Sequence, residues 1–180
     1  GDPHVGTYYV ALFNYVFARK TEGDFVLRIE DTDRTRFVQG AEQRIIDGLK
    51  WLQLQHDEGP DVGGEFGPYR QSERYELYRE HARRLVEKGR AYRCFCTAER
   101  LEQLRARQRD EKLPFGYDQF CRRLSPEESQ EKLARGVPHV IRLSVPDDGQ
   151  TSFTDRLRGP VTIPNAEVDD QILIKSDGYP

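Results

Sequence analysis

The spacing of apolar residues predicts alternating helices and strands in the first half of the chain. Apolar side chains recur every three or four residues over positions 8–20 and 41–54, as they do in amphipathic helices. Between them, positions 25–27 form an apolar run typical of a strand buried between helices. The predicted inner faces are Val10, Phe13, Val16 and Phe17 in the first helix, and Ile45, Ile46, Leu49, Trp51 and Leu52 in the second. This alternation predicts an α/β, Rossmann-like domain with a parallel sheet. Its first strand would lie before residue 1, so we expect a truncated domain.

The second half of the chain predicts a smaller unit of a different kind. Ser72 is a suitable N-cap for a helix that ends near residue 88, where Gly89 can stop it. The remaining predicted elements are a helix at 126–135 and β-rich runs at 138–145, 161–164 and 171–175, separated by turns. We therefore expect two domains, residues 1–88 and an α+β domain at residues 89–180.

Composition and charge restrict the class of protein. The chain has 180 residues, is 36% hydrophobic and 33% charged, and contains no apolar run near the roughly 20 residues that a membrane helix needs. Three cysteines, an odd number, argue against a disulfide framework, so we expect a cytoplasmic protein without membrane contact, and a monomer. Residues 70–109 hold 12 basic and 6 acidic side chains, a net charge of +6 within a chain of net charge −3. This stretch is either a polyanion-binding patch or a solvated helix laced with salt bridges.

The first residues form a candidate phosphate site. Pro3 disfavours helix at the residue before it, and Thr7 can cap the helix that follows. A helix start with free backbone amides and an imidazole from His4 suits an anion, and Gly6 permits a ring to approach the backbone closely. The alternative is a proline turn that caps an ordinary helix.

A dense polar cluster follows the predicted strand directly. Ligands of α/β sheets collect at the carboxyl ends of strands, so a cluster in this position indicates a site. The alternative is a solvated charged loop. Its members are Arg28, Glu30, Asp31, Asp33, Arg34 and Arg36.

A second candidate site is a metal centre. Residues alternate in direction along a strand, so Cys94 and Cys96 would point to one face. Together with Tyr117 and Cys121 they can supply four ligands to a tetrahedral zinc ion, although three unligated thiols are the alternative. Asp169 and Asp170 are also adjacent, but we expect them in a loop or at a strand edge.

Four stretches together resemble class I aminoacyl-tRNA synthetases, and glutamyl-tRNA synthetases in particular. They are residues 1–7 (GDPHVGT), 27–34 (LRIEDTDR), 68–74 (PYRQSER) and 175–180 (KSDGYP), in the order of that family. Cys94 and Cys96, followed by Tyr117 and Cys121, also resemble a Cys-x-Cys and Tyr-x3-Cys pattern found in some of these enzymes and in tRNA-modifying relatives. Others have a histidine where this chain has Arg123.

The resemblance implies a fold, a reaction and roles for residues. The fold is a class I nucleotide-binding domain with an inserted α+β domain that binds the tRNA acceptor stem. The reaction joins L-glutamate to tRNA(Glu) through a glutamyl adenylate, with ATP as substrate, Mg²⁺ and, in some members, Zn²⁺. The implied catalytic residues are His4, on the ATP phosphates, and Gly6, on the adenosine. Thr7 would join them in binding ATP, Glu30 would bind the ammonium of glutamate, and Arg36 would contact tRNA.

The activity expected of the 180 residues alone is low. The family also uses residues beyond both ends of this sequence, so we expect little or no aminoacylation by these residues by themselves. Two other functions fit less well: transfer of glutamate to a modified tRNA base, and a zinc-stabilised RNA-binding module without catalysis.

Overall fold

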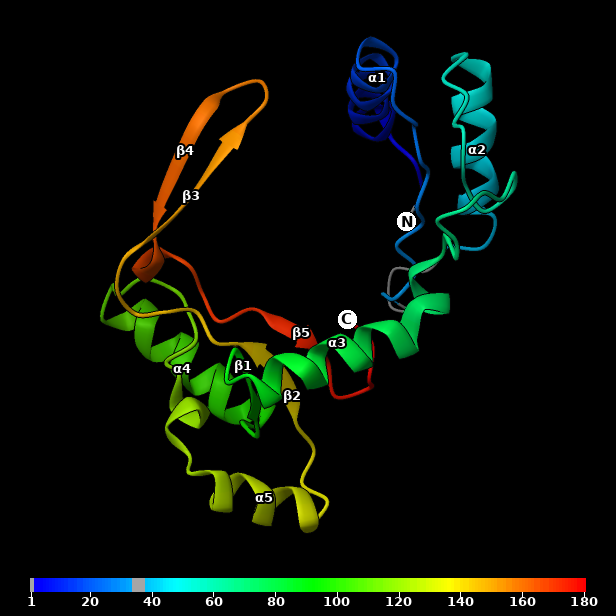
Figure 1. Cartoon of the computed structure of the whole chain (residues 1–180). Helices are drawn as coiled ribbons and strands as arrows, with labels where there is room; N and C mark the ends of the chain where they lie inside the picture. The colour runs from blue at the N-terminus through cyan, green and yellow to red at the C-terminus, as the bar shows by residue number, and fades with distance from the viewer. Residues whose placement is uncertain (1, 34–37) are drawn as a thin grey trace. The chain divides into compact units, whose positions relative to one another are not determined.

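The computed structural model describes residues 2–33 and 38–180, in two compact units, Gly1–Tyr75 and Glu76–Pro180 (Figure 1). The division lies where helix α3 (Tyr75–Glu87) begins, and the expected domain boundary after residue 88 stays a prediction. Among the described residues, no helix is long and apolar enough to cross a bilayer.

The first unit is built on two helices, α1 (Val5–Lys20) and α2 (Ala41–Trp51). They meet where Gly48 faces Tyr8, because a Cβ at Gly48 would lie 2.0 Å from the Tyr8 hydroxyl oxygen. That hydroxyl donates a hydrogen bond to the Arg44 carbonyl, 3.1 Å away. The glycine thus leaves room for the Tyr8 ring to reach the backbone of α2.

The predicted strand at 25–27 is present as extended chain with parallel pairing. Parallel bridges join Val26 to Glu58 and Ile29 to Arg70. The Leu27 amide donates to the Glu58 carbonyl at 2.9 Å, and the Ile29 amide donates to the Tyr69 carbonyl at 2.8 Å. The pairing is parallel, as the sequence predicts, but it amounts to single bridges rather than a continuous strand. The partner segments at 58 and 70 are separated by a glycine- and proline-rich loop, which limits the length of each pairing.

Two predicted inner faces differ from the structure. On α2, Ile46 and Leu49 are buried as predicted, whereas Trp51 is 81% exposed. At 100° per residue, Trp51 lies about 200° around the helix from Leu49 and therefore on the opposite side. On α1, the residues predicted to be buried are exposed in this structure: Val10, Phe13, Val16 and Phe17. The spacing correctly identifies an apolar helix face, but it does not show whether the described residues cover it.

An ion pair holds the end of α1 to the loop that follows α2. Arg19 makes two hydrogen bonds with Asp57, at 2.8 and 3.0 Å, and the Asp57 carboxylate also accepts the Phe25 amide at 2.7 Å. The Arg19 hydrogen bonds, followed by the Phe25 amide, lower the pKa of Asp57 below its ordinary value of about 3.8.

This lowered pKa makes the stability of the first unit depend on pH. A lowered folded-state pKa contributes stability that is complete above the unfolded pKa and is lost as the pH falls through the folded pKa. We expect Asp57→Asn to be about 1 kcal/mol less stable than wild type at pH 7 in urea unfolding, with the difference shrinking as the pH falls through the lowered pKa of Asp57. Protection of the Phe25 amide from hydrogen exchange should fall in parallel. The exposed Asp24→Asn is the control, and a pH-independent difference would contradict the assignment.

The second unit contains a three-stranded antiparallel sheet, a hairpin and short helices. The sheet has the order β1 (Ala91–Cys94), β2 (Val140–Leu143), β5 (Ile172–Ile174). Strands β3 (Gln150–Asp155) and β4 (Gly159–Pro164) form a separate hairpin (Figure 1). The other elements are the helices α4 (Ala98–Asp110) and α5 (Pro126–Ala134) and the single turns η2 (Gln71–Arg74, in the first unit), η3 (Phe120–Arg123) and η4 (Asn165–Glu167).

The helix ends of the second unit are only partly as predicted. Gly89 has a φ of +66°, and the amides of residues 89 and 90 close the end of α3 on the carbonyls of Val86 and Leu85. Helix α5 begins at Ser125 with a capping box to Glu128 and matches the predicted helix at 126–135. Ser72, however, is not the N-cap of α3, because it lies within η2 and its hydroxyl donates to Asp31.

Candidate functional site

His4, and not Thr7, is the N-cap of helix α1. Its Nδ1 accepts the Gly6 amide at 3.0 Å, while its own amide faces the Thr7 hydroxyl at 3.4 Å, so the two residues form a capping box. Because Nδ1 accepts a hydrogen bond, the proton of the neutral ring resides on Nε2, which remains available as a donor. A Cβ at Gly6 would lie 2.7 Å from His4 Cε1, so a larger residue here would push the imidazole out of its capping position.

The start of α1 and the acidic cluster line one cavity of about 740 Å³. His4, Gly6 and Thr7 contribute from the helix start, and Glu30, Asp31 and Asp33 contribute from the end of the paired segment. A second cavity of about 680 Å³ shares Thr7, Arg28 and Glu30 with the first and extends to Asn14 and Tyr69. Segments about 25 residues apart in sequence therefore converge at one place, with the positive end of a helix beside carboxylates.

Glu30 is more exposed than a buried ammonium-binding carboxylate would be. Its side chain is 72% exposed, and its Oε1 lies 3.5 Å from a guanidinium nitrogen of Arg28. The expected pairing of a buried carboxylate with a substrate ammonium is therefore not preformed among the described residues. Arg36, the predicted tRNA contact, lies outside the described residues.

The residues of the stretch 68–74 bind carboxylates of the first unit, among them Asp31 of the polar cluster, a role that the sequence did not reveal. Ser72 donates its amide and its hydroxyl to Asp31, at 2.8 and 2.5 Å. Arg70 binds both carboxylate oxygens of Glu42, at 2.7 and 3.1 Å. Tyr69 makes a short hydrogen bond to Glu58, which holds the pKa of that carboxyl below its usual range. No spacing rule links these partners, because each pair joins distant segments.

The basic stretch on α3 and α4 contains many local ion pairs. Arg84 pairs with Glu80, and Arg83 lies 3.7 Å from Glu87, each one turn along α3. Arg107 pairs in the same way with Glu111 at 3.3 Å. These contacts favour a solvated helix surface over a dedicated anion patch at those positions.

The predicted metal ligands come together in the second unit. The sulfur atoms of Cys94, Cys96 and Cys121 all lie within 4.8 Å of one another. Tyr117 Oη lies 3.2 Å from the Cys94 sulfur and 3.3 Å from the Cys96 sulfur, and Cys96 and Cys121 are 3.5 Å apart. Around a tetrahedral zinc ion with Zn–S bonds of about 2.3 Å, two sulfurs are about 3.8 Å apart. The donor types and their spacing thus fit zinc with only small adjustments.

The environment of these ligands favours charge on Cys94. Its interaction with the Cys121 thiol, with smaller contributions from Tyr117 and Arg142, lowers the pKa of Cys94. Burial, followed by the neighbouring thiols, raises the pKa of Tyr117. The Cys121 sulfur accepts the Phe95 amide at 3.3 Å, and Tyr117 Oη accepts the Cys121 amide at 2.9 Å. Backbone donors therefore already face two of the four ligands.

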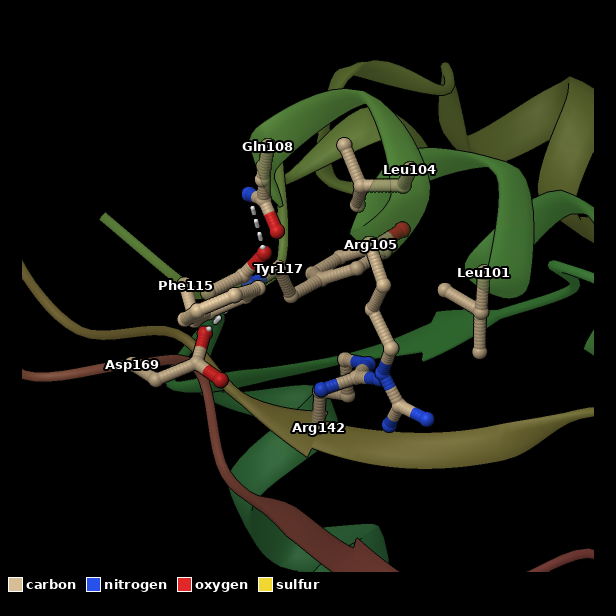
Figure 2. A pocket seen from close by; sticks show the side chains of 9 residues that line it. Leu101, Leu104, Arg105, Gln108, Phe115, Tyr117, Arg142 and Asp169 are labelled. Carbon is tan, nitrogen blue, oxygen red and sulfur yellow. Dashed lines mark hydrogen bonds between the residues drawn. The ribbon is translucent and has the colours of Figure 1, made fainter. Parts of the chain in front are cut away.

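A further cavity, of about 330 Å³, lies beside the cysteine cluster (Figure 2). Figure 2 shows Arg105 and Gln108 on α4, with Arg142 on β2 and Asp169 ahead of β5. Asp169 accepts the Tyr117 amide at 3.0 Å. Its neighbour Asp170 is only 1% exposed and accepts the Tyr92 hydroxyl and the Val145 amide. Both residues lie in the loop that precedes β5, as expected, but Asp170 is buried there and ties three segments of the core together.

The first unit thus combines a helix N-terminus, a capping imidazole and carboxylates around one cavity, as in the nucleotide-binding domains of class I aminoacyl-tRNA synthetases. Residues 1–180 match the family of class I tRNA synthetases (E and Q), catalytic domain, and the chain belongs to that family.

Its relatives are glutamate–tRNA ligases. The chain is 62% identical over all 180 residues to that of Fusobacterium nucleatum and 57% identical to that of Thermus thermophilus, and it spans 35% and 37% of their lengths. A crystal structure of the glutamate tRNA ligase of Elizabethkingia meningosepticum in complex with its amino acid superimposes with a TM-score of 0.90. The identity is 37%, over 100% of this chain and 37% of that one. These matches confirm the predicted class I synthetase fold and the predicted family.

Proposed function

We propose that the protein containing these residues joins L-glutamate to the 3′ end of tRNA(Glu) through a glutamyl adenylate. The observation that carries this proposal is that His4, Gly6, Thr7 and Glu30 all line the same cavity. The glutamate–tRNA ligases that the chain resembles support it, although the chain spans about a third of their length.

In this reaction, His4 Nε2 and the positive end of the α1 dipole bind the phosphates of ATP, with Thr7 beside them. Gly6 permits the adenosine to approach the backbone. Mg²⁺, bound together with ATP, would supply positive charge to the phosphate oxygens. Glu30 exchanges its pairing with Arg28 for the ammonium of glutamate, which orients the amino acid carboxylate toward the α-phosphate. Activation then depends on alignment and charge stabilisation, and no side chain forms a covalent intermediate. The glutamate carboxylate attacks the α-phosphate and releases pyrophosphate. A ribose hydroxyl of tRNA then attacks the acyl carbonyl and releases AMP.

The second unit serves the same reaction as a tRNA-binding module. Zinc bound by Cys94, Cys96, Tyr117 and Cys121 would fix strand β1 to η3, as structural zinc sites do.

Arg36, in the first unit, is a proposed tRNA contact. The working form is a monomer in the cytoplasm.

Pyrophosphate exchange tests the proposal. A protein that continues this sequence at both ends, as its relatives do, should exchange pyrophosphate into ATP when glutamate and tRNA(Glu) are present. The 180 residues alone should show little or no exchange. Charging of a tRNA that bears a modified base, in place of the 3′ end, would instead favour the tRNA-modifying activity. Binding of tRNA by the extended protein without any affinity for ATP would favour an RNA-binding module.

A further inference from the structure

Arg142, on strand β2, is a buried cation next to the proposed zinc ligands. It is only 6% exposed. Its guanidinium carbon lies 4.0 Å from the centroid of the Tyr117 ring, and its Nη1 donates to the Asp170 carbonyl at 2.7 Å. Figure 2 shows Arg142 and Tyr117 together on the wall of the cavity. Its Nε is buried without a hydrogen-bond partner among the described residues.

Among the described residues, the guanidinium of Arg142 has no directly bonded carboxylate partner. Within residues 2–33 and 38–180, no carboxylate forms an ion pair with Arg142 at 4.0 Å or less. Asp169 accepts the Tyr117 amide, and Asp170 accepts the Tyr92 hydroxyl and the Val145 amide, so both carboxylates bond directly to groups other than Arg142. Arg122, the nearby second arginine, already pairs with Asp147 at 3.0 Å. A buried charge is stable only where another charge or dipole compensates it.

The proposed ligand set would carry the opposite charge. Three thiolates and one tyrosinate bring four negative charges to the two positive charges of zinc, so the loaded site has a net charge of −2. Cys94 and Cys121 are buried, and water therefore screens little of that charge. A guanidinium over an aromatic ring is attracted by the ring face, and more strongly when the phenol is ionised.

We propose that Arg142 is the positioning residue that compensates the charge of the Tyr117 ligand and thereby sets the zinc affinity of the second unit. The proposal rests on the zinc site proposed above, because it assigns a role within that site. The competing explanation is that Arg142 only supports the sheet through its hydrogen bond to the Asp170 carbonyl.

Zinc affinity of the 180-residue chain, measured by competition with a chromophoric chelator, separates these explanations. Arg142→Met removes the charge and keeps the length of the side chain, whereas Arg142→Lys keeps a charge. Partners that surround a metal site typically change its affinity by about 10–100-fold, so we expect Arg142→Met to weaken zinc binding by that factor. Arg142→Lys should lose less than about 10-fold. The matched control is Arg105→Met, because the exposed Arg105 lines the same cavity and should leave the affinity unchanged.

The spectrum of the protein shows whether Arg142 acts through Tyr117. Zinc addition to wild type should produce the near-ultraviolet absorbance of one tyrosinate, which Tyr117→Phe should abolish and Arg142→Met should reduce. In the Tyr117→Phe background, Arg142→Met should cost much less affinity than in wild type. An equal cost in both backgrounds would establish the purely structural role and overturn the proposal. If Arg142→Met fails to fold, Arg142→Lys is compared in the wild-type and Tyr117→Phe backgrounds instead. A loss of zinc affinity above 10-fold in folded Arg142→Lys overturns the proposal.

The possible failures are distinguishable. If wild type binds no zinc, the zinc site itself is wrong and the role of Arg142 falls with it. If wild type binds zinc and Arg142→Met behaves like Arg105→Met, the zinc site stands and only the role of Arg142 is rejected.

Discussion

Cys121→Ser is expected to lose more than about 100-fold in zinc affinity, beyond the range seen when only a surrounding residue is changed. The physical reason is that a hydroxyl is a much poorer zinc ligand than a thiolate, and the remaining three donors leave one tetrahedral position without a protein ligand. Because Cys121 lies in η3 and Cys94 in β1, the loss should also free these two segments from each other.

The accompanying loss of stability can be measured with a chelator. At a free zinc concentration of 100 times the dissociation constant, binding to the folded state contributes about 2.7 kcal/mol to the free energy of unfolding. Chelation of wild type should therefore lower its urea midpoint to that of Cys121→Ser, and chelation of the variant should have no further effect. A wild type that contains no metal and is insensitive to the chelator would contradict the zinc site.

The metal ligands were predictable because the relevant information is local. Cys94 and Cys96 are two positions apart, and Tyr117 and Cys121 are four apart, so each pair is close in the chain although only Cys94 lies on β1 and only Cys121 lies in η3. Arg142 was not predictable in the same way. Its contact with Tyr117 depends on the pairing of β2 with β1, and no periodicity in the sequence specifies that pairing in advance.

The first unit shows the same division between local and long-range information. Helix positions follow from apolar spacing, and the structure contains both predicted helices. Burial does not follow from spacing alone, as exposed Trp51 and the exposed face of α1 demonstrate. The convergence of His4 with Glu30 was expected from the rule for strand ends. The hydrogen bonds from Ser72 to Asp31 that hold this arrangement join residues 41 positions apart, and no sequence pattern predicts them.

Glu30→Gln is expected to raise the KM for glutamate by about 10–100-fold in a protein that continues this sequence at both ends. The change keeps the size of the side chain and removes its charge. Hydrogen bonds to charged groups contribute about 1.5–3 kcal/mol, which corresponds to that range. The KM for ATP should change little, because the phosphates are assigned to His4 and the start of α1. Pyrophosphate exchange with tRNA present, at varied glutamate and then at varied ATP, measures both constants.

The control for this prediction is Glu22→Gln, which removes an exposed carboxylate just after α1 that lines neither cavity of the first unit. The position of Arg28 makes the result more specific. Arg28 lies 3.5 Å from Glu30, so the ammonium of glutamate competes with a cation that is already present. Arg28→Met should therefore leave the KM for glutamate unchanged or lower it, the opposite direction to Glu30→Gln. Equal increases in both variants would indicate that the two residues only support the local fold, and the ammonium-binding role of Glu30 would then be rejected.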